Sequence, residues 1–377
     1  MEKNSNILYF DYSATTPTNK DVLDIFNMVS LNFIGNPNSH HKLGIQANNL
    51  VNNSTDEISK LLSVLPNEVI YTSGASESNN MAIKGITTYE GKHIITTRFE
   101  HPSIYGPITY LEKNGYEVDF VKTNEKGMVD LDDLKSLLKD DTVLVTIASV
   151  NSEIGLKQPI KEIGELLLNY PNCVFHVDIT QSIGKENISL ENIDLASISA
   201  HKFFGIKGIG LLVKKENIKL EPLIHGGKST TAFRSGTPAP ALICSLAEAL
   251  RIAYEELDLK YKRVEKWNNY LQDKLSNYEK VRINSNEYSI PHILNISILG
   301  TNPTKFQEAL EEHKVYVSTQ TACHTGSDVS LSVMALTKDE ERAKSSIRIS
   351  LSYVTTQDEL DKFLIAFDEC YKKMVNS

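Results

Sequence analysis

Short apolar runs that end in polar or glycine-containing turns recur along the N-terminal two thirds of the chain. We expect a strand at each run, over residues 7–10, 69–72, 93–97, 117–121, 142–149, 173–177, 195–199 and 209–213. Apolar residues at helical spacing predict helices over residues 21–31, 44–62, 79–85, 131–138 and 160–168. Strands that alternate with helices are joined by crossover connections. The pattern therefore predicts an α/β fold with a mainly parallel central sheet.

The C-terminal third has a different pattern. Residues 241–275 are expected to be mostly helical and to link two lobes. Shorter elements follow, with strands expected over residues 293–298, 315–318 and 346–351 and a helix over 303–313. Thr356 and Glu359 have the spacing of a capping box that opens a final helix. We therefore predict a large domain over residues 11–262 and a smaller α+β C-terminal domain over residues 263–377, which residues 1–10 join.

Composition and charge exclude several classes of partner. The 377 residues carry a formal net charge of -9, with Lys and Arg interspersed among acids. This leaves no basic stripe for a phosphate backbone, so direct binding to nucleic acid is not expected. The first residues lack the basic and apolar regions of a signal peptide, and no stretch is long and apolar enough to span a bilayer. We expect a cytoplasmic protein without membrane attachment.

The cysteines are scattered, and no pair has C-x-x-C spacing. A disulfide framework and structural zinc are therefore not expected, and we predict no metal site. Cys173, Cys244 and Cys370 lie in apolar segments and are interpreted as small core residues. Cys323 lies instead in a loop of Ser, Thr, Gln and Gly, beside a histidine. An accessible cysteine next to a potential cation can be a reactive thiolate.

Polar side chains follow several of the expected strands at their carboxyl ends. Ligands of parallel sheets collect in the loops at that edge. The loops there carry Ser76, His101, Asn151, Ser152, Asp178, Gln181, His201 and Lys202. Convergence of so many polar residues where one site is expected favours a functional site over ordinary helix capping.

One of these residues, Lys202, is a candidate nucleophile. It follows an apolar run in the sequence SISAHKFFG and is surrounded by aromatic and glycine residues that would hydrate an ammonium poorly. Burial disfavours the charged form of a lysine and prepares its amine for imine chemistry. The alternative is a surface lysine beside a turn.

The turn over residues 73–78 suits a phosphate group. Its small hydroxyl residues stand between a strand and a helix, where free N–H groups and the helix dipole favour an anion. The alternative is simple capping of the helix by Ser76. Two nucleotide motifs are rejected: the first glycine of a P-loop ending at Ser229 is replaced by Pro222, and the glycines at 205, 208 and 210 have the wrong spacing for a dinucleotide fingerprint.

A series of short motifs, in order along nearly the whole chain, resembles the cysteine desulfurases of the NifS/IscS type. The motifs are YFDYSATTP, GNPNSHH, YTSGASESNN, EHPS, NSEIG, HVDITQSIGK, SAHKFFGIKGIG, HGGK, RSGT, TACHTG and SIRIS. Each one is weak alone, but eleven in order are specific. The family consists of fold-type I enzymes of the class V aminotransferase group that use pyridoxal 5'-phosphate (PLP). The resemblance therefore implies the PLP-dependent transferase fold type I and PLP as cofactor.

The resemblance also implies roles for residues around the cofactor. Lys202 would hold PLP covalently, and Asp178 would keep the pyridine nitrogen protonated, which makes the ring an electron sink. Gln181 matches a residue near the phenolic oxygen of the ring. His101 matches a histidine that lies over the ring and acts as acid and base. The positions that match phosphate ligands are Ala75, Ser76, Ser199, His201 and Thr237.

Further matches concern the substrate, the subunits and the sulfur. Thr237 matches a residue supplied across a dimer interface, which implies a homodimer. Arg348 matches the arginine that binds the substrate α-carboxylate, for which a planar guanidinium fork is suited. Asn36 matches a loop asparagine near that carboxylate. Cys323 matches the cysteine that forms a persulfide.

Two departures from the family pattern stand out. The family usually has Asn at the position of Ser152, where the side chain contacts the phenolic oxygen, and a hydroxyl is shorter than an amide. We therefore expect the chemical properties of the bound cofactor to differ from those in the family, and we expect cofactor binding to be unchanged. The small residues around the cysteine are also altered, with Thr321 before Ala322 and His324 after Cys323.

The function implied is an L-cysteine desulfurase that converts cysteine to alanine and leaves a persulfide on Cys323. The sulfur would pass to an acceptor protein, a scaffold or a thiolation enzyme, for iron-sulfur clusters, thio-cofactors or tRNA thiolation. One alternative is selenocysteine lyase or another class V aminotransferase-type activity. The other is a non-catalytic PLP-binding regulator, against which the presence of Lys202, Arg348 and Cys323 argues.

Overall fold

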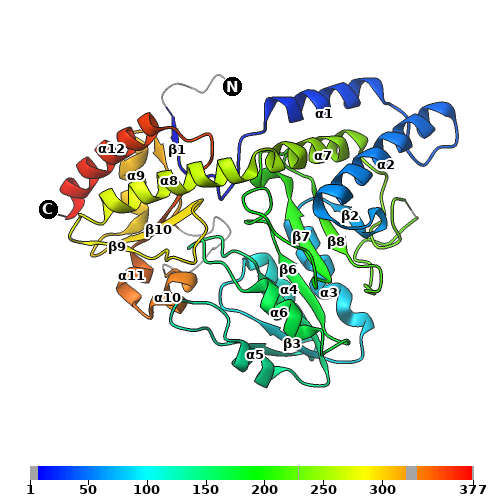
Figure 1. The fold of residues 1–377 in the computed structure, drawn as a ribbon, viewed down its shortest axis with the longest axis horizontal. Helices are drawn as coiled ribbons and strands as arrows, with labels where there is room; N and C mark the ends of the chain where they lie inside the picture. Colours follow the sequence, from blue (N-terminus) through cyan, green and yellow to red (C-terminus); the bar gives the residue numbers. More distant parts are fainter. Residues whose placement is uncertain (1–6, 228, 320–328, 376–377) are drawn as a thin grey trace.

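A central sheet organises the larger part of the protein. The computed structural model describes residues 7–227, 229–319 and 329–375. The sheet has seven strands in the order β2-β8-β7-β6-β5-β3-β4 (Figure 1). Their bounds are Val69–Thr72 (β2), His93–Thr96 (β3), Glu117–Phe120 (β4), Thr142–Ala148 (β5), Val174–Asp178 (β6), Leu195–Ser199 (β7) and Gly210–Lys214 (β8). Strand β8 runs in the direction opposite to the other six strands of this sheet, which all run the same way. The prediction of a mainly parallel α/β sheet is therefore confirmed.

Helices cover both faces of this sheet. They are α2 (Lys42–Leu62), α3 (Ala75–Gly85), α4 (Pro102–Lys113), α5 (Leu131–Leu137), α6 (Ile160–Leu167) and α7 (Pro240–Tyr254). Helix α1 (Lys20–Asn32) packs chiefly on α7. The burial of strand β5 on both faces explains why its sequence is mostly apolar. Val145 and Ile147 join the core under α6 and α7, while Leu144 joins the core under α3 and α4. A strand buried on both faces needs apolar residues at successive positions.

A second core lies in the C-terminal part, which occupies the left of Figure 1. Strands β9 (Val281–Ile283), β10 (Ile293–Ile298) and β12 (Ser346–Ser350) form an antiparallel sheet in the order β12-β10-β9. The helices are α8 (Leu257–Leu275), α9 (Pro303–Glu312), α10 (Leu331–Thr337), α11 (Glu340–Lys344) and α12 (Gln357–Val375). Strand β1 (Leu8–Tyr9) pairs in parallel with β11 (Val315–Tyr316). The domain boundary between residues 262 and 263, which falls inside α8, stays a prediction.

Several elements differ from the sequence expectation. The long helical segment is two helices, α7 and α8, because Glu256 adopts a left-handed conformation with φ 52° between them. Helix α3 begins at Ala75, four residues before its expected start at Asn79. Helix α4 has no counterpart among the expected elements. The capping box is confirmed, since the Thr356 N–H donates to Glu359 at 2.8 Å and the Glu359 N–H donates to Thr356 Oγ1 at 3.3 Å.

The three cysteines that the structure describes are buried, as predicted for core residues. Burial raises the pKa of Cys173 to about 12 and that of Cys370 to about 11, so both thiols stay protonated at neutral pH. Cys323 lies outside the described residues. Within the described ranges, no helix combines the length and apolar character that crossing a membrane requires.

Candidate active site

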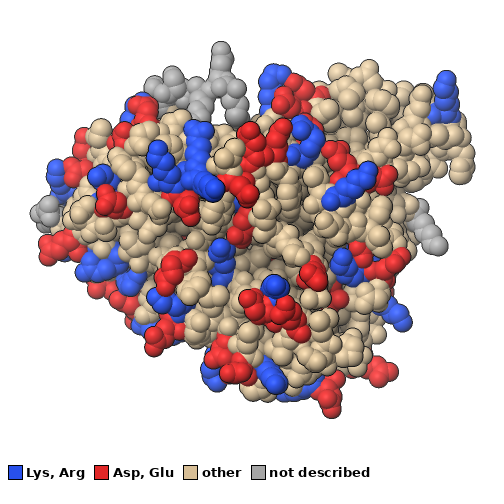
Figure 2. Space-filling model, viewed as in Figure 1, with Lys and Arg blue, Asp and Glu red and all other residues tan. Residues whose placement is uncertain are grey.

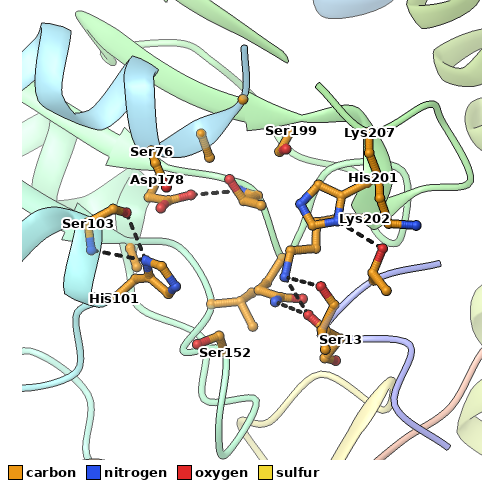
Figure 3. A pocket seen from close by; sticks show the side chains of 18 of the residues that line it. Ser13, Ser76, His101, Ser103, Ser152, Asp178, Ser199, His201, Lys202 and Lys207 are labelled. Carbon is orange, nitrogen blue, oxygen red and sulfur yellow. Dashed lines mark hydrogen bonds between the residues drawn. The ribbon is translucent and has the colours of Figure 1, made fainter. Parts of the chain in front are cut away.

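A cavity of about 400 Å³ lies at the carboxyl ends of the parallel strands (Figure 3). It brings together most of the predicted site residues: Ala75, Ser76, His101, Ser152, Asp178, Gln181, Ser199, His201, Lys202 and Arg348. Asn36 and Thr237 are exposed and do not line it. Among the residues described, no group of three His, Cys, Asp or Glu side chains could hold a metal ion.

Lys202 lies at the centre of the cavity in Figure 3, at the end of the turn Ala200–Lys202 that follows β7. Its Nζ donates to the backbone oxygens of Ser13 at 2.6 Å and Ala14 at 3.0 Å. The turn is held in place by Thr16, whose N–H donates to the His201 oxygen at 2.8 Å. A Cβ on Gly205 would come within 2.6 Å of the Ala200 Cβ, so this close turn requires glycine.

One end of the cavity is suited to a phosphate group. Gly74 precedes α3 with φ 151° and gives the helix no side-chain cap, so the N–H groups of the first turn face the cavity edge uncapped. The alternative role of Ser76 as the helix cap is therefore wrong, because Gly74 occupies that position. Ser199, His201 and Lys207 lie at the same end in Figure 3. Burial and the nearby lysines lower the pKa of His201 to about 4, so its ring is neutral and carries one N–H donor.

A chain of hydrogen bonds joins Asp178 to His101. Asn79 Nδ2 donates to Asp178 Oδ2 and to Ser103 Oγ, both at 2.9 Å. Ser103 Oγ lies 2.8 Å from His101 Nδ1, and the Ser103 N–H donates to the same nitrogen at 3.1 Å. Because Nδ1 accepts that N–H, a neutral His101 ring carries its proton on Nε2. His101 is thereby fixed in orientation as well as in tautomer.

Glu100 lies directly behind this chain. Its carboxyl accepts hydrogen bonds from Thr97 Oγ1 at 2.7 Å and from the Ala148 N–H at 3.0 Å. Burial, with a further contribution from the charge of Asp178, raises the pKa of Glu100 to about 8. At neutral pH Glu100 is therefore mostly protonated, and it adds no second negative charge beside Asp178.

Arg348, on β12, enters the cavity from the smaller core. Its side chain is 1 % exposed. Nη2 donates to Asp11 Oδ1 at 2.8 Å, and Nη1 donates to the backbone oxygen of Ser152 at 2.8 Å. Its Nε is buried and has no hydrogen-bond partner within the described ranges. A buried guanidinium with an unused donor is suited to a carboxylate.

Comparison with known proteins gives the family. The family model for class-V aminotransferases matches residues 8–363. The chain belongs to this family. Cysteine desulfurase IscS of Vibrio cholerae is 40 % identical over 366 residues, which cover 94 % of this chain and 90 % of that protein.

Solved structures agree with this assignment. A NifS-like protein superposes with a TM-score of 0.91 at 34 % identity and covers 97 % of this chain and 99 % of its own. A structure of SspA in complex with cysteine superposes with a TM-score of 0.81 at 30 % identity and covers 92 % and 99 %. The predicted fold type I is therefore confirmed.

PLP is the cofactor of this family, and the polar groups of the cavity fit it. The uncapped start of α3 suits its phosphate. Asp178 suits its pyridine nitrogen, because among the described residues Oδ1 accepts one hydrogen bond, from the Thr180 N–H at 2.9 Å, and the carboxylate retains further acceptor capacity. Lys202 lines the same cavity.

The sequence analysis missed the residues that support these groups. Asn79, Glu100, Ser103 and Lys185 lie within the motifs YTSGASESNN, EHPS and HVDITQSIGK. Their presence there was the available signal. Their contacts join positions far apart, as in the Asn79–Asp178 hydrogen bond across 99 residues, so spacing alone gives no role.

Replacement of Glu100 by Gln tests the neutral carboxyl. The folded pKa of Glu100 is raised from 4.5 to about 8. Its folded form therefore binds a proton more tightly than its unfolded form, and stability falls as pH rises between these values. The loss is ~1.4 kcal/mol per pH unit in that window. Glu100→Gln should remove this pH-dependent loss of stability. The urea midpoint of the variant, measured relative to that of the wild type, should therefore be higher at pH 8 than at pH 5.

The exposed Glu112 on α4 provides the control, because Glu112→Gln should shift the midpoint equally at both pH values. If Glu100→Gln behaved like this control, Glu100 would be ionised in the folded protein.

Proposed function

We propose that the protein is a PLP-dependent L-cysteine desulfurase that forms its persulfide on Cys323. The observation that carries the proposal is a single cavity in which Lys202, Asp178 and Arg348 converge. Relatives named as cysteine desulfurases, and the SspA structure that contains cysteine, support the choice of substrate.

Each residue of the cavity has a role that follows from its contacts. Bound PLP supplies an electron sink for the carbanion that forms at the substrate Cα. Asp178, held by Asn79 and Thr180, keeps a proton on the pyridine nitrogen. Arg348 binds the substrate α-carboxylate, and His101 presents its Nε2–H to the ligand. Because Nδ1 of His101 is an acceptor, the neutral ring donates at the cavity and does not accept there.

Lys202 moves the proton. Its Nζ would remove the Cα proton of the substrate and return a proton to the product. The backbone oxygens of Ser13 and Ala14 accept hydrogen bonds from the amine and orient it.

In the sulfur-transfer step, the Cys323 thiol accepts the sulfur atom of the substrate. The thiolate forms an S–S bond with the substrate sulfur as the Cβ–S bond breaks, and the electron pair of that bond passes to the carbon skeleton. Protonation at Cβ and Cα completes alanine. The overall change is therefore cysteine plus the Cys323 thiol giving alanine plus the Cys323 persulfide, which passes its sulfur to an acceptor protein.

We further propose a homodimer, which explains the two predicted residues outside the cavity. Thr237 and Asn36 are exposed on one subunit and would serve the site of the other. The projecting end of α1 and α2 supports this, because it exposes large apolar side chains: Leu23, Met28, Leu31, Ile34, Leu43 and Ile45. Few charged residues cover this projection in Figure 2. Large exposed apolar patches are typical of interfaces.

The first test concerns Lys202 and the reaction. The purified protein should be yellow, and borohydride should fix the mass of the cofactor on the peptide that contains Lys202. It should release alanine from L-cysteine without a keto acid, and dithiothreitol should release sulfide. Label on Lys207 would contradict the assignment of Lys202. A requirement for a keto acid would indicate transamination, and turnover of selenocysteine alone would indicate a lyase of that substrate.

The second test concerns Cys323. Cys323→Ser should still bind cysteine, as a change in the cofactor's absorbance, but should lose nearly all alanine release and form no persulfide. A serine hydroxyl is a far poorer nucleophile than a thiolate. The Ala variants of Cys173, Cys244 and Cys370 are the controls, because these buried thiols should affect stability more than turnover. Wild-type alanine release by Cys323→Ser would exclude the persulfide mechanism.

A further inference from the structure

Lys185 is a buried lysine to which the mechanism gives no role. It lies in the turn after β6 and is 8 % exposed. Its Nζ donates to Gln181 Oε1 at 2.6 Å. No carboxylate forms an ion pair with it within the described ranges, and the adjacent Glu186 instead lies 3.5 Å from Lys157.

The surroundings of Lys185 make its charge costly. Burial is the main cause, and the charges of Lys202 and Arg348 add to it; together they lower the pKa of Lys185 to about 7. A buried amine without an anion destabilises the fold unless a hydrogen bond compensates. The bond to Gln181 is therefore the contact through which Lys185 can act on the cavity.

Gln181 is held at both ends of its carboxamide. Oε1 accepts from Lys185, and Nε2 donates to the backbone oxygen of Ser13 at 3.0 Å. A backbone oxygen only accepts, and the Lys185 amine donates in its contact, so the pair of contacts selects one of the two amide orientations. The same Ser13 oxygen accepts from Lys202 Nζ at 2.6 Å. Gln181 also lines the main cavity.

We propose that Lys185 is a positioning residue that fixes the Gln181 carboxamide with its NH₂ group toward Ser13 and the cavity. One N–H of that group bonds Ser13, and the other is left to donate to the anionic ring oxygen of the cofactor. This inference rests on the proposed function, which has PLP in the cavity, and on the family resemblance, which implies that Gln181 lies near its phenolic oxygen. A purely structural Lys185 would affect stability without acting through Gln181.

The test measures the pH midpoint of the cofactor's absorbance change in the holoenzyme. A hydrogen bond donated to an anionic oxygen disfavours protonation next to it, so losing that bond should raise the midpoint. Lys185→Met removes the donor at nearly constant volume and should raise the midpoint by on the order of half a pH unit. Gln181→Met should raise it by a similar amount while leaving Lys185 in place.

The double variant separates the two roles. If Lys185 acts through Gln181, Lys185→Met combined with Gln181→Met should have the midpoint of Gln181→Met alone. Additive shifts, or an unchanged midpoint in Lys185→Met, would overturn the proposal. If Lys185→Met fails to fold, Gln181→Met still tests the proposal. An unchanged midpoint in Gln181→Met would show that Gln181 donates no hydrogen bond to the ring oxygen, and the proposal would then be wrong.

Lys214 provides the matched control. It is another buried lysine, 3 % exposed, whose Nζ donates only to the backbone oxygens of Lys215 and Ile218 among its described contacts. Lys214→Met should leave the midpoint unchanged. Failure of the proposed function is recognised separately, because the wild-type protein would then lack the cofactor absorbance or release no alanine from cysteine.

Discussion

The backbone oxygen of Ser13 is the point at which the site depends on the rest of the fold. It accepts hydrogen bonds from Lys202 at 2.6 Å and from Gln181 at 3.0 Å. The segment that carries it starts in the smaller core, where Phe10 is buried. One short stretch of chain therefore connects the small core to two side chains that line the cavity. Any shift of the N-terminal segment would displace both side chains together.

The charges of the cavity are arranged around this contact. On the side of the central sheet, a neutral Glu100 leaves Asp178 as the anion beside His101. After β6 and β7, the lowered pKa values of Lys185 and His201 limit the number of positive charges that surround Lys202. The arrangement reduces repulsion between like charges within the cavity. The positive groups that stay charged can then attract an anionic cofactor and substrate.

Local patterns in the sequence predicted the mainly parallel sheet and the polar residues at its carboxyl edge. Ala75, Ser199 and Arg348 were added only through the family resemblance. Apolar runs such as β5 and β6 gave the strands, and parallel strands bring their carboxyl ends to one edge, where Asp178 and Lys202 meet. The predicted start of α3 was wrong because the helix begins after Gly74, which has φ 151° and provides no side-chain cap that the sequence could show. The roles of Asn79 and Lys185 depend on tertiary contacts that spacing does not contain.

Arg348 shows how the same contacts bear on substrate choice. A guanidinium that is 1 % exposed has already lost its water, so a ligand carboxylate meets no hydration shell to displace from it. Two of its nitrogens are held by Asp11 and the Ser152 oxygen at 2.8 Å, which fix the plane of the fork. The negative charge of Asp11 also compensates the arginine. Within the described ranges the buried Nε has no partner, so under the proposed function the substrate carboxylate would give the arginine a further anionic partner.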